Sequence, residues 1–129
     1  MESIAKEPGT WPWPESLDAV VAAPGSHRVV FENERTRVLE VIIGPGEREP
    51  EHTHRWPSVM VVHRPARIRY YTGDTLTFIS PEQPSPAEAG ARVSWLDPEG
   101  PHSVENIDGH VYGAFRIEFK VSSQVLLQA

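Results

Sequence analysis

The spacing of proline and glycine constrains the fold of this chain more than any other feature. There are 13 prolines and 9 glycines in 129 residues, and they recur at intervals through the whole length. Because both residue types interrupt regular structure, this spacing leaves little room for long helices. The stretches between them indicate short strands, so the sequence predicts an all-β domain.

Six stretches carry the pattern of strands. They are residues 37–43, 58–63, 68–71, 75–79, 92–96 and 111–121. Gly73-Asp74 lies between the third and the fourth and predicts a hairpin turn. Many short strands with frequent turns are typical of a sandwich or barrel of antiparallel sheets.

In the last stretch, residues 111–121, apolar and polar residues alternate with a period of two. This pattern indicates a strand with one buried and one solvated face. The face expected to be buried holds Val111, Gly113, Phe115, Ile117, Phe119 and Val121, and the solvated face holds Tyr112, Arg116, Glu118 and Lys120.

Composition excludes several classes of partner. The formal net charge of −6 disfavours nonspecific binding to nucleic acid or to an anionic membrane. No apolar run reaches the length of a transmembrane helix, and residues 1–15 hold no apolar stretch that could serve as a signal peptide. The chain has no cysteine, hence no disulfide framework. Together these features predict a cytoplasmic protein.

Three histidines predict a metal site. His52 and His54 are two residues apart, so in a strand they point to the same face. His102 follows about fifty residues later. Neutral imidazoles are common ligands of transition metals, and three of them with open coordination positions suit Zn, Fe, Ni, Mn or Cu.

The surroundings of these histidines resemble the two motifs of the cupin family. Gly46 is followed by five residues and then by His52-Thr53-His54, as in the first motif. Residues 98–102, Pro-Glu-Gly-Pro-His, with Asn106 four residues after the histidine, are similar to the second. The resemblance covers about residues 28–121. Upstream, residues 18–24 and 30–35 resemble a small, mostly uncharacterised bacterial cupin subgroup.

The chain departs from the family pattern at two places. The metal-binding glutamate of the first motif should fall at position 58 or 59, where this chain has Ser58 and Val59. In the second motif one residue, rather than the usual two, separates Gly100 from His102. A site without the carboxylate is one unit more positive, so it should attract an anionic, chelating substrate such as a diketonate, a carboxylate or a catecholate.

The resemblance implies a single jelly-roll β-barrel with a metal held by His52, His54 and His102. We expect residues 1–27 to form an N-terminal arm, residues 28–121 the barrel, and residues 122–129 a C-terminal tail. Within the arm, residues 16–22 predict a short helix with Ser16 as its N-cap. Residues 81–91 predict an exposed loop. Cupins commonly dimerise through such arms and edge strands, so a homodimer is expected.

Three hypotheses about function remain open. The first is a metal-dependent enzyme, with dioxygenase-type oxidation of a small organic molecule as the best match and isomerase or hydrolase chemistry left open. The divalent metal is expected to be Fe, Zn, Ni or Mn. The alternative is a non-catalytic cupin that holds or senses a small ligand with weak or no metal. A structural dimer with a vestigial pocket is the third hypothesis.

Further residues are expected near the pocket. The expected lining residues are Ser58, Met60, Trp56, Tyr70, Trp95, Asn106 and Phe115. Trp56 could equally be a packed loop aromatic, Trp95 favours a core role, and the family resemblance makes Asn106 mainly structural.

Other polar residues are expected outside the site. His63 should face away from the pocket, and His27 and His110 lie in predicted turns exposed to solvent. Glu51 and Glu105 alternate out of the inward set, so neither is a good general base. The strand arginines predict a solvated face, although one inward arginine could hold an anionic substrate; they are Arg37, Arg67, Arg69 and Arg116.

Overall fold

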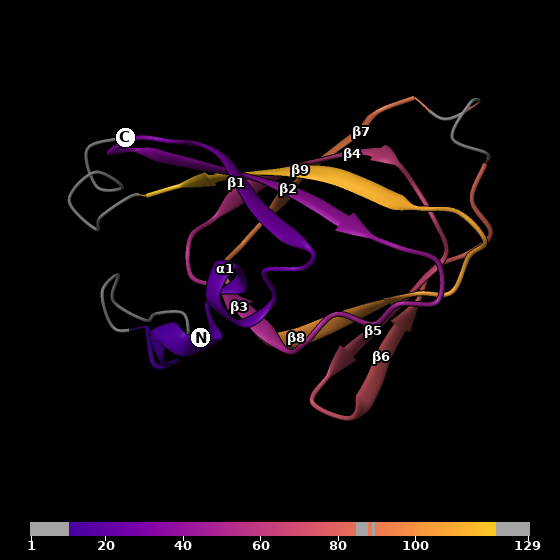
Figure 1. Cartoon of the computed structure of the whole chain (residues 1–129), viewed down its shortest axis with the longest axis horizontal. Coiled ribbons are helices and arrows are strands. Elements are labelled where there is room, and N and C mark those ends of the chain that lie inside the picture. Colours follow the sequence, from indigo (N-terminus) through magenta and orange to yellow (C-terminus); the bar gives the residue numbers. More distant parts are fainter. Residues whose placement is uncertain (1–10, 85–87, 89, 121–129) are drawn as a thin grey trace.

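Two antiparallel sheets face each other and form a barrel (Figure 1). The computed structural model describes residues 11–84, 88 and 90–120. One sheet has five strands in the order β1 (His27–Glu32), β2 (Thr36–Ile43), β9 (Tyr112–Phe119), β4 (Ser58–Arg64) and β7 (Arg92–Leu96). The other has four, in the order β3 (His52–His54), β8 (Glu99–Asn106), β5 (Ile68–Thr72) and β6 (Thr75–Ile79). The predicted all-β fold of two antiparallel sheets is confirmed.

Two glycines make turns that position the strands. Gly73 has a φ of 62° between the paired residues Thr72 and Thr75, so it lies in the left-handed region that favours glycine. This is the hairpin predicted between β5 and β6. Gly46, the first residue of the first motif, has a φ of 77° in the loop that leads to β3.

The inward face of β9 is the reverse of the one predicted. Arg116 and Glu118 are buried, whereas Phe115, Ile117 and Phe119 are only partly buried. The period of two is correct, but the assumption that the apolar face points inward is wrong. The interior of this barrel holds charged side chains because they pair there with one another. Val121, the last residue of the pattern, lies outside the described residues.

A short helical segment closes one end of the barrel beside β3 (Figure 1). It consists of the 3₁₀ helix η1 (Glu15–Leu17) and the one-turn helix α1 (Ala19–Ala22). The N-cap of α1 is Asp18, whose carboxylate accepts from the amide of Val20, and not Ser16 as predicted. Asp18 also forms a parallel bridge to Thr53 in β3, which fixes this segment against the motif histidines.

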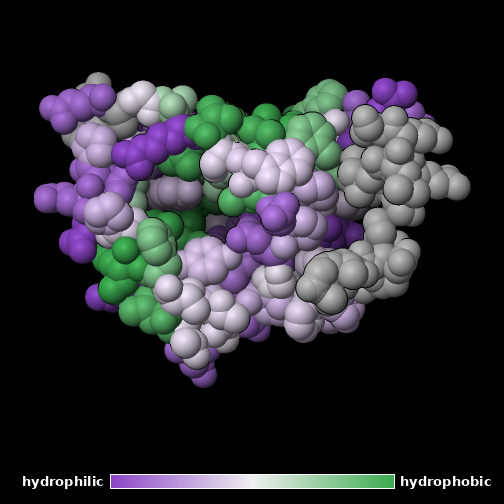
Figure 2. Space-filling model, turned by 180° about the vertical axis from the view of Figure 1, so that it is seen from behind, coloured by the Kyte–Doolittle hydropathy of each residue, from purple (hydrophilic) through white to green (hydrophobic). Residues whose placement is uncertain are grey.

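The apolar core includes Ala19 of this helical segment and extends along β2 and β9. Its buried residues are Ala19, Leu39, Val41, Ile43, Ala66, Tyr112 and Ala114. Met60, Val62 and Ile68 pack against them from β4 and β5. Apolar side chains also reach the surface, where they surround a hollow on the face turned away from the view of Figure 1 (Figure 2). Among the described residues, no helix is long and apolar enough to cross a membrane.

Parts of the predicted organisation fall beyond the described residues. Residues 1–10 of the predicted arm, residues 85–87 and 89 of the predicted loop, and the predicted tail 122–129 are among them.

Candidate metal centre

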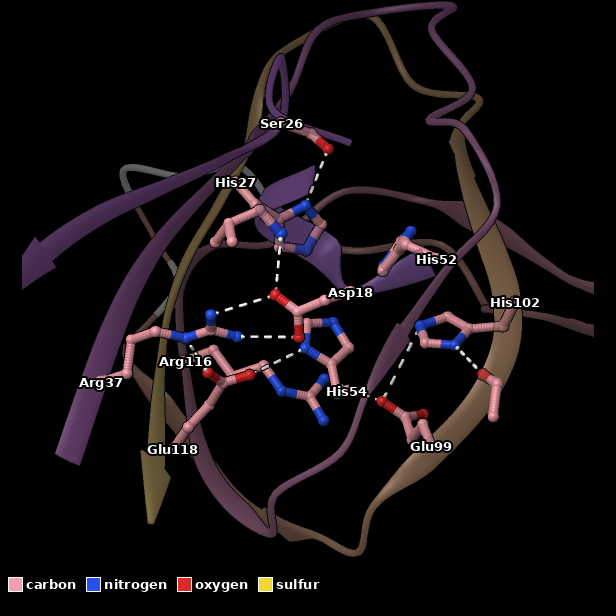
Figure 3. A network of polar contacts seen from close by, with 12 residues as sticks. Asp18, Ser26, His27, Arg37, His52, His54, Glu99, His102, Arg116 and Glu118 are labelled. Atoms are coloured by element: carbon pink, nitrogen blue, oxygen red, sulfur yellow. Dashed lines mark hydrogen bonds and ion pairs between the residues drawn. The ribbon is translucent and has the colours of Figure 1, made fainter. Parts of the chain in front are cut away.

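Pairing between β3 and β8 brings the two motifs together. His52 lies directly opposite His102, and His54 lies opposite Glu99. Side chains on directly opposite strand residues are close neighbours, because their Cβ atoms are about 5 Å apart. The ring centroids of His52 and His102 are 4.5 Å apart, and those of His52 and His54 are 5.1 Å apart. The three predicted histidines therefore meet inside the barrel (Figure 3).

A fourth histidine, His27, joins them from the first residue of β1. Its ring lies 4.6 Å from that of His52 and 5.2 Å from that of His54. The prediction that His27 is exposed in a turn is wrong, since the residue is only 4% exposed. No motif spacing marks it, and its position depends on how the turn after α1 directs β1 across the sheet.

Each of these rings has its Nδ1 atom engaged by an acceptor. His52 Nδ1 donates to the carbonyl of Pro50 at 2.8 Å, and His102 Nδ1 to that of Gly100 at 2.7 Å. His54 Nδ1 donates to the Glu118 carboxylate at 3.0 Å. Since carbonyls and carboxylates only accept, the proton lies on Nδ1 and Nε2 keeps its lone pair.

His27 follows the same pattern through a serine. Ser26 Oγ donates its single proton to Glu49 at 2.8 Å, so it accepts from His27 Nδ1 at 2.9 Å. All four imidazoles thus have Nε2 available as a ligand atom. Metal-binding histidines nearly always show this arrangement, with the second ring nitrogen held by an outer acceptor.

Burial keeps the four imidazoles neutral. It is the main cause that lowers the pKa of His27 to about 2 and that of His52 to about 4, with the neighbouring histidines adding to the effect. Burial likewise lowers the pKa of His54 and of His102. Neutral imidazole is the form that binds a metal.

The ligand atoms form two overlapping groups. His27, His52 and His54 offer nitrogens within 4.8 Å of one another, and His54, Glu99 and His102 offer ligand atoms within the same limit. His54 belongs to both groups, whereas His52 and His102 of the predicted triad fall in different ones. The donor set, imidazole with carboxylate, fits a divalent transition metal.

Two carboxylates lie beside the histidines, although the first motif lacks its glutamate. Glu49 Oε1 is 3.6 Å from His52 Nε2, and Glu99 Oε1 is 3.9 Å from His102 Nε2. Burial raises the pKa of Glu49 to about 7. Burial also raises the pKa of Glu99, but His102, Arg116 and the hydrogen bond from Tyr70 outweigh it and the net direction is down.

A chain of buried ion pairs orients His54. Arg37 Nε donates to Glu118 at 2.6 Å, and its two terminal nitrogens donate to Asp18 at 3.0 and 3.2 Å. Glu118 in turn accepts from His54 Nδ1. Arg37 is 6% exposed, so its predicted place on a solvated face is wrong.

Arg116 is the second buried arginine and also contradicts the predicted solvated face. It is 3% exposed, and its Nη1 donates to Glu99 at 2.8 Å. Its Nε and Nη2 atoms, like Ser58 Oγ, are buried without a hydrogen-bond partner among the described residues. Arg116 is the inward arginine that the sequence left unassigned.

A cavity of about 380 Å³ adjoins the histidines. The four histidines, Glu49, Glu99 and Arg116 line its polar side. The remaining lining is mainly apolar and consists of Val41, Ile43, Met60, Val62, Ile68, Tyr70, Phe78, Ser94, Leu96, Val104 and Tyr112. Of the seven predicted lining residues, the cavity therefore includes Met60 and Tyr70.

The structure places the other five predicted lining residues elsewhere. Trp95 is 57% exposed and stacks on Phe119 outside the barrel, so its predicted core role is wrong. Phe115 packs on His63. Trp56 lies under the Arg37 guanidinium in a separate surface pocket. The remaining two are fully buried: Ser58 pairs with Glu118 of β9, and Asn106 has a structural role.

The side-chain amide of Asn106 donates to the backbone carbonyls of Ile43 and His110 at 2.9 Å. It joins β2, the end of β8 and the loop before β9. His110, which was predicted to be exposed, is half-buried, and its Nε2 lies 3.0 Å from the carbonyl of Pro65. His63 is exposed, as predicted.

Comparisons with known proteins rest on structure alone, since no protein-family model and no curated protein matches the sequence. A cupin domain from Bordetella pertussis is similar over 74% of this chain and 92% of its own, with a TM-score of 0.61 and 21% identity. An RmlC-like cupin family protein with a double-stranded β-helix fold, from Methanocaldococcus jannaschii, is similar over 80% and 84%, with a TM-score of 0.53 and 12% identity. The chain therefore has the double-stranded β-helix fold of the cupin superfamily, as its two motifs predict.

Proposed function

We propose that this protein is a metal-dependent enzyme that acts on a small organic molecule inside the barrel. One observation carries the proposal: four buried, neutral imidazoles meet beside a cavity, each with Nδ1 held by an acceptor and Nε2 available. A polar cluster of this kind costs free energy to bury without a ligand, because each unpaired polar atom loses its hydration.

His54, which belongs to both groups of ligand atoms, is the central ligand of the proposed centre, and His27, His52 and His102 are its further imidazole ligands. The metal is a divalent transition metal, and imidazole ligands suit Fe, Zn, Ni or Mn. Once bound, it would supply a Lewis acid that polarises a carbonyl or, as iron, a redox centre for dioxygenase-type oxidation.

The chain's own residues limit what the cavity can accept. Its volume of about 380 Å³ lies at the lower end of the range for small-molecule sites. The apolar wall around Val62, Ile68 and Val104 favours a substrate with an apolar body. The polar side, where Arg116 lies among the histidines, favours an anionic group such as a carboxylate or an enolate.

The second candidate is a non-catalytic cupin that binds a small ligand with weak or no metal. Arg116 favours it, because a guanidinium beside the histidines opposes the approach of a dication. Ser58, at the position of the family glutamate, favours it as well.

Elemental analysis of untagged protein purified without chelator separates the two. The enzyme proposal predicts one transition metal per chain, lost in a His52→Ala/His54→Ala double variant. A His63→Ala/His110→Ala double variant is the matched control, because both of its histidines lie outside the cavity lining. Protein that stays metal-free after soaking with Fe(II), Zn, Ni and Mn would favour the second candidate.

Oxygen uptake then tests the reaction class. Fe(II)-loaded protein should consume dioxygen with at least one member of a panel of diketones, thiols, catechols and small carboxylates. If the protein binds metal but neither consumes dioxygen nor converts any compound of the panel, it is a binding protein that carries a metal.

A homodimer and a cytoplasmic location are predictions from the sequence. The homodimer agrees with the exposed apolar residues on the edge strands, Val29, Val30 and Phe31 on β1 and Val93 and Trp95 on β7. Sedimentation equilibrium should give twice the chain mass of 14.4 kDa, and a single-chain mass at micromolar concentration would contradict it.

A further inference from the structure

We infer that Glu99 supplies the carboxylate ligand that the first motif lacks at position 58. The inference rests on the proposed metal centre and assigns one of its ligands. In the family pattern the carboxylate comes from the strand after the first motif, whereas here it would come from the second motif, between Pro98 and Gly100.

The position of Glu99 in the sheet directs it at the histidines. It lies opposite His54 in the β3–β8 pairing and three residues before His102 on its own strand. Its carboxylate and the ring nitrogens of His54 and His102 lie within 4.8 Å of one another. A ligand atom from each could therefore reach one ion.

Two donors hold the Glu99 carboxylate in this orientation. Tyr70 donates its hydroxyl to Oε2 at 2.6 Å, and Arg116 Nη1 donates to Oε1 at 2.8 Å. The Tyr70 ring also stacks on His102, with centroids 5.1 Å apart and planes within 3°. Each carboxylate oxygen keeps a further lone pair, so both hydrogen bonds are compatible with metal ligation. Ligating carboxylates are commonly held by such outer partners.

Ser58 and Glu49 are weaker candidates for this ligand. Ser58 is fully buried, but its short hydroxyl has no partner among the described residues and carries no charge. Glu49 lies near His52 and accepts a hydrogen bond from the hydroxyl of Ser26. Glu49 is not part of either group of mutually close ligand atoms that the histidines form. Glu99 combines proximity to two imidazoles with a fixed orientation.

The same strand provides a matched control. Glu105 on β8 accepts from the hydroxyl of Tyr71 at 2.7 Å and lies 3.5 Å from Arg69 Nη1, so it repeats the tyrosine–glutamate–arginine arrangement of Glu99. It does not line the cavity. A Glu105→Gln substitution therefore removes an equivalent carboxylate away from the histidines.

Cobalt(II) titration of metal-free protein tests the assignment, because the visible absorption of Co(II) reports its ligands. Glu99→Gln should weaken Co(II) binding by at least about tenfold, the lower bound for losing even an outer partner of a ligand, and should change the visible spectrum. Glu105→Gln should leave both unchanged. Ser58→Glu in the Glu99→Gln background, which returns a carboxylate at the family position, should recover affinity.

Four results overturn the inference or its basis. Unchanged Co(II) affinity in Glu99→Gln excludes Glu99 as a ligand, and so does weaker binding with an unchanged spectrum, which shows an outer role. Equal weakening by Glu105→Gln makes the effect nonspecific. Absence of Co(II) binding to the unsubstituted protein contradicts the metal centre itself, and is thereby distinguished from the other three.

Glu99→Gln leaves the buried Arg116 without its partner, which could prevent folding. The double variant Glu99→Gln/Arg116→Met removes both charges and keeps the test decisive. It should bind Co(II) more weakly than Arg116→Met alone, and equal affinity in the two variants excludes Glu99 as a ligand.

Discussion

Arg37 shows at the residue scale how the barrel stabilises a buried charge. Its guanidinium binds Asp18 from the helical segment and Glu118 from β9, and Glu118 is fully buried. A buried ion pair of this kind contributes little net stability, but removing one partner leaves an uncompensated charge. Arg37 therefore connects three parts of the chain, and His54 depends on its position through Glu118.

Substituting Arg37→Ala should lower the free energy of unfolding by about 3–5 kcal/mol, because Glu118 loses its buried partner. Urea denaturation measures this change. Arg28→Ala is the control, since Arg28 pairs with Glu40 at the surface with 72% of its side chain exposed, and such pairs contribute about 0–1 kcal/mol. Equal losses in the two variants would contradict the role given to Arg37.

Single site residues were predictable only where spacing marks them. His52, His54 and His102 follow from two motifs, and pairing of β3 with β8 brings them together. His27 is a single histidine that precedes the apolar residues of β1. No second histidine lies at a spacing from it that would indicate a motif. Its place in the site depends on tertiary structure, which no local pattern encodes.

At the scale of elements, the β5–β6 hairpin depends on the conformation of Gly73. With a φ of 62° it occupies a region where a Cβ atom clashes with its own backbone. The hairpin carries Tyr70, which contacts both Glu99 and His102. The turn thereby influences the proposed metal centre.

Gly73→Ala should destabilise the fold by about 1–2 kcal/mol through backbone strain alone, since an added Cβ meets no other atom within 4 Å. Gly109→Ala, where space is also open and φ is not positive, should be close to neutral. Urea midpoints of the two variants compare them. A neutral Gly73→Ala would show that the turn tolerates another conformation.

The positions of the strands along the sequence were easier to predict than which face of each strand is buried. The stretches 75–79 and 92–96 coincide with β6 and β7, because glycine and proline mark their ends. The inward face of β9 was not predictable from hydropathy. Its inward Arg116 and Glu118 are stable only because Glu99, Arg37 and His54 meet them from other elements.

At the scale of the whole molecule, the barrel interior is unusually rich in titratable groups. Burial lowers the pKa values of the four histidines, so their unfolded forms bind protons that the folded forms do not. Their contribution to stability is complete above pH 6.5 and is lost as the pH falls towards 4 and below. Glu49, with its pKa raised to about 7, and Glu118, also raised by burial, act in the opposite direction but are fewer.

Metal-free protein should therefore lose stability between pH 7 and pH 5, by about 1.4 kcal/mol per pH unit for each net proton taken up on unfolding. Urea midpoints in the presence of a chelator measure this dependence. A midpoint that stays constant or rises on acidification would contradict the neutral buried cluster.

Anomalous diffraction from a crystal soaked in zinc tests directly whether the barrel holds a metal, because it locates the ion without reference to activity. A metal centre in the barrel predicts one strong peak there, within bonding distance of His54 Nε2 and of at least two further ligands among His27, His52, His102 and Glu99. No peak inside the barrel, or peaks confined to surface residues such as His63, would contradict a metal centre in this protein.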